Sequence, residues 1–166
     1  TTASLTYDDQ NLYIAMRMEE PRMSEQTLVQ ASSTGGLSED DSIEINIDPT
    51  PDTDDYIQIM MNANSVMWVW WRGKHKPNLT PDLAIRGKAW RGEKEWTCEL
   101  AVPFGKIADR PPASGEHWTL NGLRNRCLPD TNSRHNPDRY AVWAVPFTWS
   151  FHVKERFGTI VFGEEP

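Results

Sequence analysis

The sequence is poor in the features that mark membrane-spanning, zinc-binding and nucleic-acid-binding proteins. No apolar run approaches the roughly 18 residues that a membrane-spanning helix needs. The two cysteines, Cys98 and Cys127, make no zinc framework, because they form no CxxC pair. Acidic residues outnumber basic ones by 24 to 17, and the formal net charge is −7. We therefore expect neither a nucleic-acid partner nor attachment to an anionic membrane.

Signatures of common catalytic devices are missing as well. The sequence contains no G-x-S-x-G turn for a serine nucleophile. Its four histidines show neither HxH nor HExxH spacing, so they do not indicate a catalytic metal. The sequence gives no positive reason to expect an enzyme.

What the chain does have is alternation of apolar and polar residues, which is typical of half-buried β-strands. Turn-forming residues separate the expected strands, at 11–20, 42–48, 56–62, 65–72, 83–91, 95–102, 117–127, 140–145 and 157–162. Only residues 104–109 could form a helical turn. At 166 residues, one domain is expected. The pattern predicts an all-β, antiparallel two-sheet β-sandwich, immunoglobulin-like or jelly-roll-like, with little helix.

Strands 42–48 and 56–62 are close in sequence and are expected to pair. Each has Ile and Met on one face and Ser, Glu, Gln, Asn or Tyr on the other, so one face should lie on the core and one in water. Arg17, from strand 11–20, is a candidate to join this polar face. Fixed amides and carboxylates beside aromatic loops suit the hydroxyls and ring faces of a sugar.

The two cysteines are expected to be unpaired. Strands 95–102 and 117–127 are predicted to form a hairpin through residues 103–116. In that hairpin the partner of Cys98 falls near residues 120–123, several positions short of Cys127.

Five segments appear in order along the chain: YDDQNLYIAMRMEEP, DDSIEINIDPTPDTDDYIQIMMNANS, WTCELAVPFGKI, HWTLNGLR and FGTIVF. Together they resemble family 9 carbohydrate-binding modules and, more broadly, the sugar- and haem-binding DOMON domains. The resemblance implies a non-catalytic, secreted module, extracellular or periplasmic, that binds an oligo- or polysaccharide. It also implies a linked glycoside hydrolase or lyase domain. Such modules usually begin with a further segment that has no match here, so a first strand is expected to be trimmed or diverged.

The resemblance also implies site residues. Glu44 matches a glutamate that contacts sugar hydroxyls, although a plain surface ion pair with Arg17 is the competing interpretation. Gln58 falls where the next strand carries a polar or cationic contact. Asn121 and Arg124 match an N-x-x-R pattern, which requires a bulge near Gly122 if both serve one site.

Family members hold a sugar between two Trp side chains, and the segment where the first one lies reads GGLSEDD here. Trp149 and Phe151 are the candidates for the second, and Trp70 or Trp71 could supply the other platform. We expect Glu44, Gln58, Arg124 and Trp149 to lie together on one open surface.

Three further interpretations stay open. Four carboxylates crowd one loop: Asp48, Asp52, Asp54 and Asp55. Carboxylates this dense suit calcium, but the EF-hand spacing is absent, and a solvated acidic loop is the alternative interpretation. The DOMON resemblance allows a haem-binding electron-transfer domain with Met and His ligands, although Met in an alternating strand is more often core. A glycan-active enzyme would need two carboxylates about 5–10 Å apart, and Glu19, Glu44 and Glu99 are the candidates.

Overall fold

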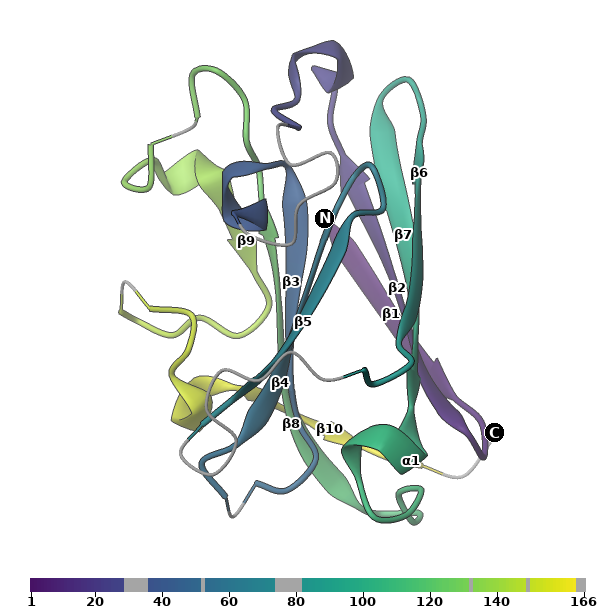
Figure 1. Cartoon of the computed structure of the whole chain (residues 1–166). Helices are drawn as coiled ribbons and strands as arrows, with labels where there is room; N and C mark the ends of the chain where they lie inside the picture. The colour runs from purple at the N-terminus through teal and green to yellow at the C-terminus, as the bar shows by residue number, and fades with distance from the viewer. Residues whose placement is uncertain (29–35, 52, 74–81, 132, 149, 164–166) are drawn as a thin grey trace.

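The structure is a computed structural model that describes residues 1–28, 36–51, 53–73, 82–131, 133–148 and 150–163. Two antiparallel sheets pack face to face, as Figure 1 shows. Buried residues from both sheets form one core between them. The predicted antiparallel β-sandwich with little helix is confirmed. Among the residues described, no helix is long and apolar enough to span a membrane.

The smaller sheet has four strands in the order β1-β2-β7-β6. Their bounds are β1 Thr2–Tyr7, β2 Asn11–Glu19, β7 Glu95–Pro103 and β6 Arg86–Arg91. Burial alternates along β2 and β7, because every second side chain points to the other sheet. The inward set includes Met16 and Met18, so these two methionines belong to the core.

The larger sheet has six strands: β10-β8-β3-β4-β5 in order, with β9 also pairing with β8. Their bounds are β10 Gly158–Val161, β8 His117–Asn125, β3 Ser42–Asp48, β4 Tyr56–Asn62, β5 Met67–Arg72 and β9 Tyr140–Val142. Short helices stand between strands: η1 Met23–Glu25, η2 Leu37–Glu39, α1 Phe104–Ile107, η3 Pro137–Arg139 and η4 Lys154–Arg156.

Every strand expected from the alternation is present, but the expectations missed β1 and one pairing was wrong. β7 and β8 do not form a hairpin: β7 pairs with β2 and β6, whereas β8 pairs with β3, β9 and β10. The connection through α1 carries the chain from one sheet to the other. Cys98 and Cys127 are nevertheless both buried and free, which confirms their predicted unpaired state.

Candidate functional site

Polar side chains line the outer face of the six-stranded sheet, on the side away from the core. β3 pairs with β4 and β8 in regular register, so Asn46 is opposed by Gln58 on one side and by Asn121 on the other. Glu44 lies two residues before Asn46 and therefore points to the same face. The predicted pairing of strands 42–48 and 56–62, and their shared polar face, are confirmed.

This polar face is not open to solvent, so that part of the expectation is wrong. The exposed fraction is 6% for Glu44, 3% for Gln58 and 1% for Asn121. Residues 143–148 and 150–154, here called the covering segment, hydrogen-bond to the face. The Asn121 amide group exchanges two hydrogen bonds of 3.0 Å with the backbone of Ala144, and Lys154 Nζ lies 2.7 Å from Asp48 Oδ2.

Glu44 is held in a small network at the centre of the face. Its Oε1 accepts a 2.9 Å hydrogen bond from Asn46 and lies 4.0 Å from His152 Nδ1, which is 2.9 Å from the Tyr56 hydroxyl. Burial lowers the pKa of His152, against the opposing effect of the Glu44 carboxylate. The side-chain oxygen of Asn46 is buried and has no hydrogen-bond partner within the described part of the chain. Such an acceptor is rare in a native protein.

Arg72, a residue not identified from the sequence, supplies the guanidinium of this face. Its Nε donates a 2.8 Å hydrogen bond to Gln58, and its guanidinium carbon lies 4.0 Å from the ring centre of Trp70. β5 alternates, so Trp70 and Arg72 share the outer face while Trp71 is 7% exposed and packs in the core. The register of β5 was the missing information, because a shift of one residue exchanges the two faces.

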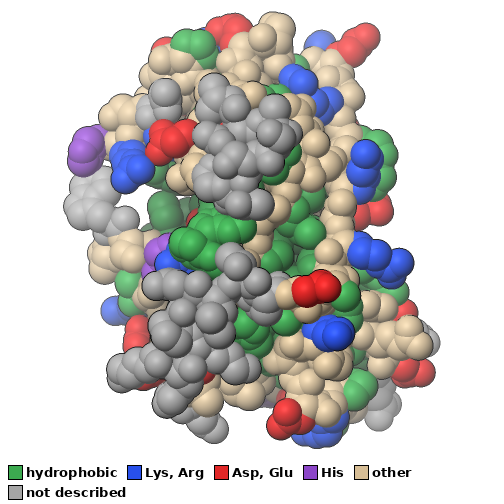
Figure 2. Space-filling view, in the orientation of Figure 1, with side chains coloured by type: hydrophobic (Ala, Val, Ile, Leu, Met, Phe, Trp, Pro, Cys, Tyr) green, Lys and Arg blue, Asp and Glu red, His purple; other side chains and the backbone are tan. Residues whose placement is uncertain are grey.

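A hollow of about 980 Å³ lies beside the polar face, lined by residues 134–137, 140, 142, 145–148 and 151. Tyr140 and Phe151, whose ring centres are 4.9 Å apart, line it together with Phe147. Val142, another lining residue, is opposed by Leu123, which is opposed in turn by Glu44, so the hollow adjoins the Glu44 network. Figure 2 shows the molecule hollowed at its left edge, with hydrophobic side chains at the back.

Arg124 does not belong to this face, which corrects the expectation that it shares a surface with Glu44. No bulge interrupts β8 at Gly122: Gly122 opposes Ile45, and Arg124 opposes Ile43, a core residue. Arg124 therefore points inward and is 3% exposed. Asn121 and Arg124 point to opposite faces and cannot serve one site.

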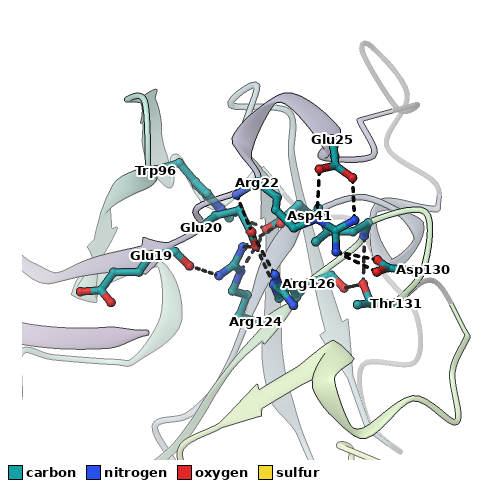
Figure 3. Close-up of polar contacts among 11 residues, drawn as sticks. Glu19, Glu20, Arg22, Glu25, Asp41, Trp96, Arg124, Arg126, Asp130 and Thr131 are labelled. Carbon is teal, nitrogen blue, oxygen red and sulfur yellow. Dashed lines mark hydrogen bonds and ion pairs between the residues drawn. The ribbon is translucent and has the colours of Figure 1, made fainter.

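Arg124 is instead the centre of a buried ion cluster at one end of the sandwich (Figure 3). Its guanidinium donates to both carboxylate oxygens of Asp41, at 3.1 and 2.8 Å, and to Glu20 at 3.1 Å. Asp41 also accepts from the indole of Trp96, and Glu20 accepts two hydrogen bonds from Arg126. Burial raises the pKa of Asp41. For Glu20 burial is the largest effect and acts in the same direction, but the hydrogen bonds from Arg126 and the Arg22 N–H, together with the charges of Arg126 and Arg124, outweigh it and lower the pKa.

Arg17 and the candidate catalytic carboxylates Glu19 and Glu99 do not lie near Glu44 either. Arg17 lies on the outer face of the four-stranded sheet and pairs with Glu95 at 2.7 Å, so it does not reach Glu44. Glu19 and Glu99 share that sheet's outer face, whereas Glu44 lies on the outer face of the other sheet. The three carboxylates therefore do not form one pair across a substrate. Trp149 lies outside the described residues.

The acidic loop after β3 does not show a metal site. The carboxylate of Asp48 is engaged by Lys154 and by the backbone N–H of Thr50. Asp52 lies outside the described residues, and both Asp54 and Asp55 make polar or ionic interactions. The described ranges contain no group of three or more His, Cys, Asp or Glu side chains arranged to hold a metal ion. Calcium binding by this loop stays a prediction.

Comparisons with known proteins find likeness in structure alone. No protein-family model matches the sequence, and a search of the curated proteins finds no significant match. Among solved structures, a family 9 carbohydrate-binding module from Caldicellulosiruptor kristjanssonii in complex with glucose matches with a TM-score of 0.69 and 17% identity. That match covers 98% of this chain and 76% of the other. A module of the same family and organism with cellotriose matches at 16% identity and a TM-score of 0.69, covering 100% and 78%.

A crystal structure from Bacteroides uniformis, of a protein with a provisional carbohydrate-binding description, matches with a TM-score of 0.72 and 14% identity. The match covers 96% of this chain and 77% of that one. At such identities the likeness shows that this chain has the β-sandwich fold of these proteins.

Proposed function

We propose that this chain is a non-catalytic carbohydrate-binding module that holds an oligo- or polysaccharide at the hollow beside the polar face. The observation that carries the proposal is an aromatic-lined hollow on the same sheet face as a network of fixed hydrogen-bonding groups, with Val142 of the hollow and Glu44 of the network both opposed by Leu123. Two solved structures of this fold contain glucose and cellotriose, which supports a saccharide as the class of ligand.

The chemistry of the two parts is complementary. A pyranose ring presents C–H groups on its flat faces and hydroxyl groups around its edge. The rings of Tyr140 and Phe151 offer surface for the faces, and Glu44 offers a charged acceptor for the edge. Beside them, Arg72 is hydrogen-bonded to Gln58, and Asn121 fixes the covering segment at Ala144.

The affinity should be modest, with a Kd in the micromolar to millimolar range, because water competes for every hydroxyl group and a sugar buries few apolar atoms. Weak single-site binding fits a module that keeps a linked glycoside hydrolase or lyase domain near its polymer. That arrangement, and an extracellular or periplasmic location where polysaccharides are met, are part of the proposal.

The test is a glycan array on the purified chain, followed by calorimetric titration of cellotriose and of the best array ligand. Glu44→Gln should weaken binding roughly tenfold, because a hydrogen bond to a charged acceptor contributes more than one to a neutral amide. Glu99→Gln is the matched control, since Glu99 is an exposed carboxylate on the opposite sheet. If no glycan on the array binds, the proposed function is wrong. If Glu44→Gln and Glu99→Gln bind equally well, the site lies elsewhere on the molecule.

A further inference from the structure

Phe147 is a large apolar side chain placed where folding alone does not favour it. Its side chain is 82% exposed, well above the 42% to 59% of the other exposed large hydrophobic residues described. Its backbone has a φ of +57°, in the left-handed region that non-glycine residues rarely occupy. The strained backbone costs stability and the exposed ring contributes almost none, so a phenylalanine at this position needs a reason outside the fold.

Two other described residues with positive φ have local explanations. Ser65 stands in the turn between β4 and β5, where its hydroxyl accepts a hydrogen bond from the backbone of Ala89. The backbone N–H of Ala84 donates to the side chain of Asp82. For Phe147, the guanidinium carbon of Arg156 lies over the ring at 5.9 Å from its centre. That exposed contact does not account for an aromatic ring in a left-handed backbone.

The chain on both sides holds Phe147 in this position. Pro146 is buried and lines the same hollow, which anchors the residue before it. On the other side, the Thr148 hydroxyl donates to the carbonyl of Ser150 and accepts from its N–H, which ties these two residues together. Phe147 is thus presented at the rim of the hollow, together with Tyr140 and Phe151 as lining residues. Backbone strain of this kind concentrates at ligand-binding sites.

We propose that Phe147 is the exposed aromatic platform that determines whether a saccharide ring is held in the hollow, and that its left-handed backbone presents the ring for this contact. The inference rests on the proposed carbohydrate-binding function. An aromatic ring held before the ligand arrives loses little conformational freedom on binding, so its contact area contributes fully to affinity.

The experiment uses Phe147→Gly, a substitution in which the backbone conformation favours the new residue. Glycine adopts positive φ without steric cost, and removing a ring that is 82% exposed loses little buried surface. The variant should therefore melt at a temperature no lower than the parent. Titrated with cellotriose and with the best array ligand, it should bind at least about tenfold more weakly. Phe147→Trp should bind like the parent, because it keeps an aromatic face.

Ser65→Gly is the matched control, since it relieves the same type of backbone strain in a turn distant in sequence from the hollow. Its affinity should equal that of the parent. The inference is overturned if Phe147→Gly binds within twofold of a parent that does bind, or if it melts markedly lower, which would show a structural role for the ring. If the parent binds no saccharide, the proposed function fails first, and the role of Phe147 fails with it.

Discussion

Replacing Arg124 by methionine should destabilise the fold far more than the same replacement of Arg17. Both arginines are ion-paired, but their surroundings differ: the Arg124 side chain is 4% exposed against Asp41 and Glu20 at 0%, whereas Arg17 and its partner Glu95 are 53% and 36% exposed. Removing one member of a buried pair leaves an uncompensated charge and costs about 3–5 kcal/mol. An exposed pair contributes about 0–1 kcal/mol, since solvent screens it.

The measurement is urea unfolding followed by tryptophan fluorescence, with the free energy of unfolding compared among the parent, Arg124→Met and Arg17→Met. A loss of about 3 kcal/mol or more for Arg124→Met alone would support a structural role for the cluster in Figure 3. The reasoning would be refuted if Arg124→Met lost less than about 1 kcal/mol. It would also be refuted if the variant kept its stability but lost saccharide binding, because Arg124 would then act as the ligand contact that the sequence pattern indicates.

Two further measurements test the surroundings of single groups. Because burial lowers the pKa of His152 below its ordinary 6.5, the folded state favours the neutral ring. The stability that this group contributes is therefore present above about pH 6.5 and is lost as the pH falls through the folded-state pKa. The unfolding free energy of His152→Gln should fall less steeply with decreasing pH in that window than that of the parent. Equal slopes for the parent and the variant would contradict this. Burial raises the pKa of Cys98 to about 12 and that of Cys127 to about 11, so neither thiol should react with a disulfide reagent at pH 8 in the folded protein, and both should react in urea. Fewer than two thiols in urea would contradict the free, buried state of the cysteines.

The alternation of residues was sufficient to predict which side chains share a face within one strand. In 42–48 and 56–62 the isoleucines lie in the core and Glu44 and Gln58 lie on the other side, as expected. Alternation is a local property with a period of two, so it does not depend on the rest of the chain. Whether a polar face meets water is decided by what packs on it. For Glu44 that is the covering segment, about 100 residues later in sequence, and nothing local to the strand indicates its position.

Arg124 shows a second limit. A charged residue in an alternating strand is normally assigned to the solvent side, and Arg124 points inward because Asp41 and Glu20, 83 and 104 positions away, pair with it. Predicting that inward orientation requires knowing which strands end at the same edge of the sandwich. The assumed hairpin of 95–102 with 117–127 put β8 in the wrong sheet, so its true neighbours were not considered.

The polar face around Glu44 and the hollow differ in the exposure of their side chains, and this difference indicates different roles in ligand binding. Glu44 and Asn121 are nearly buried and are bonded to neighbouring groups, so they are pre-oriented and can adjust little. Tyr140 and Val142 belong to β9, but Phe147 and its neighbours Val145, Pro146 and Thr148 lie on a loop, where substitutions do not disturb strand pairing. If the proposed function holds, the sheet supplies hydrogen bonds common to any saccharide, and the loops at 134–136 and 145–148 decide which saccharide is bound. Sequence changes in those loops should then alter specificity with little effect on the stability of the fold.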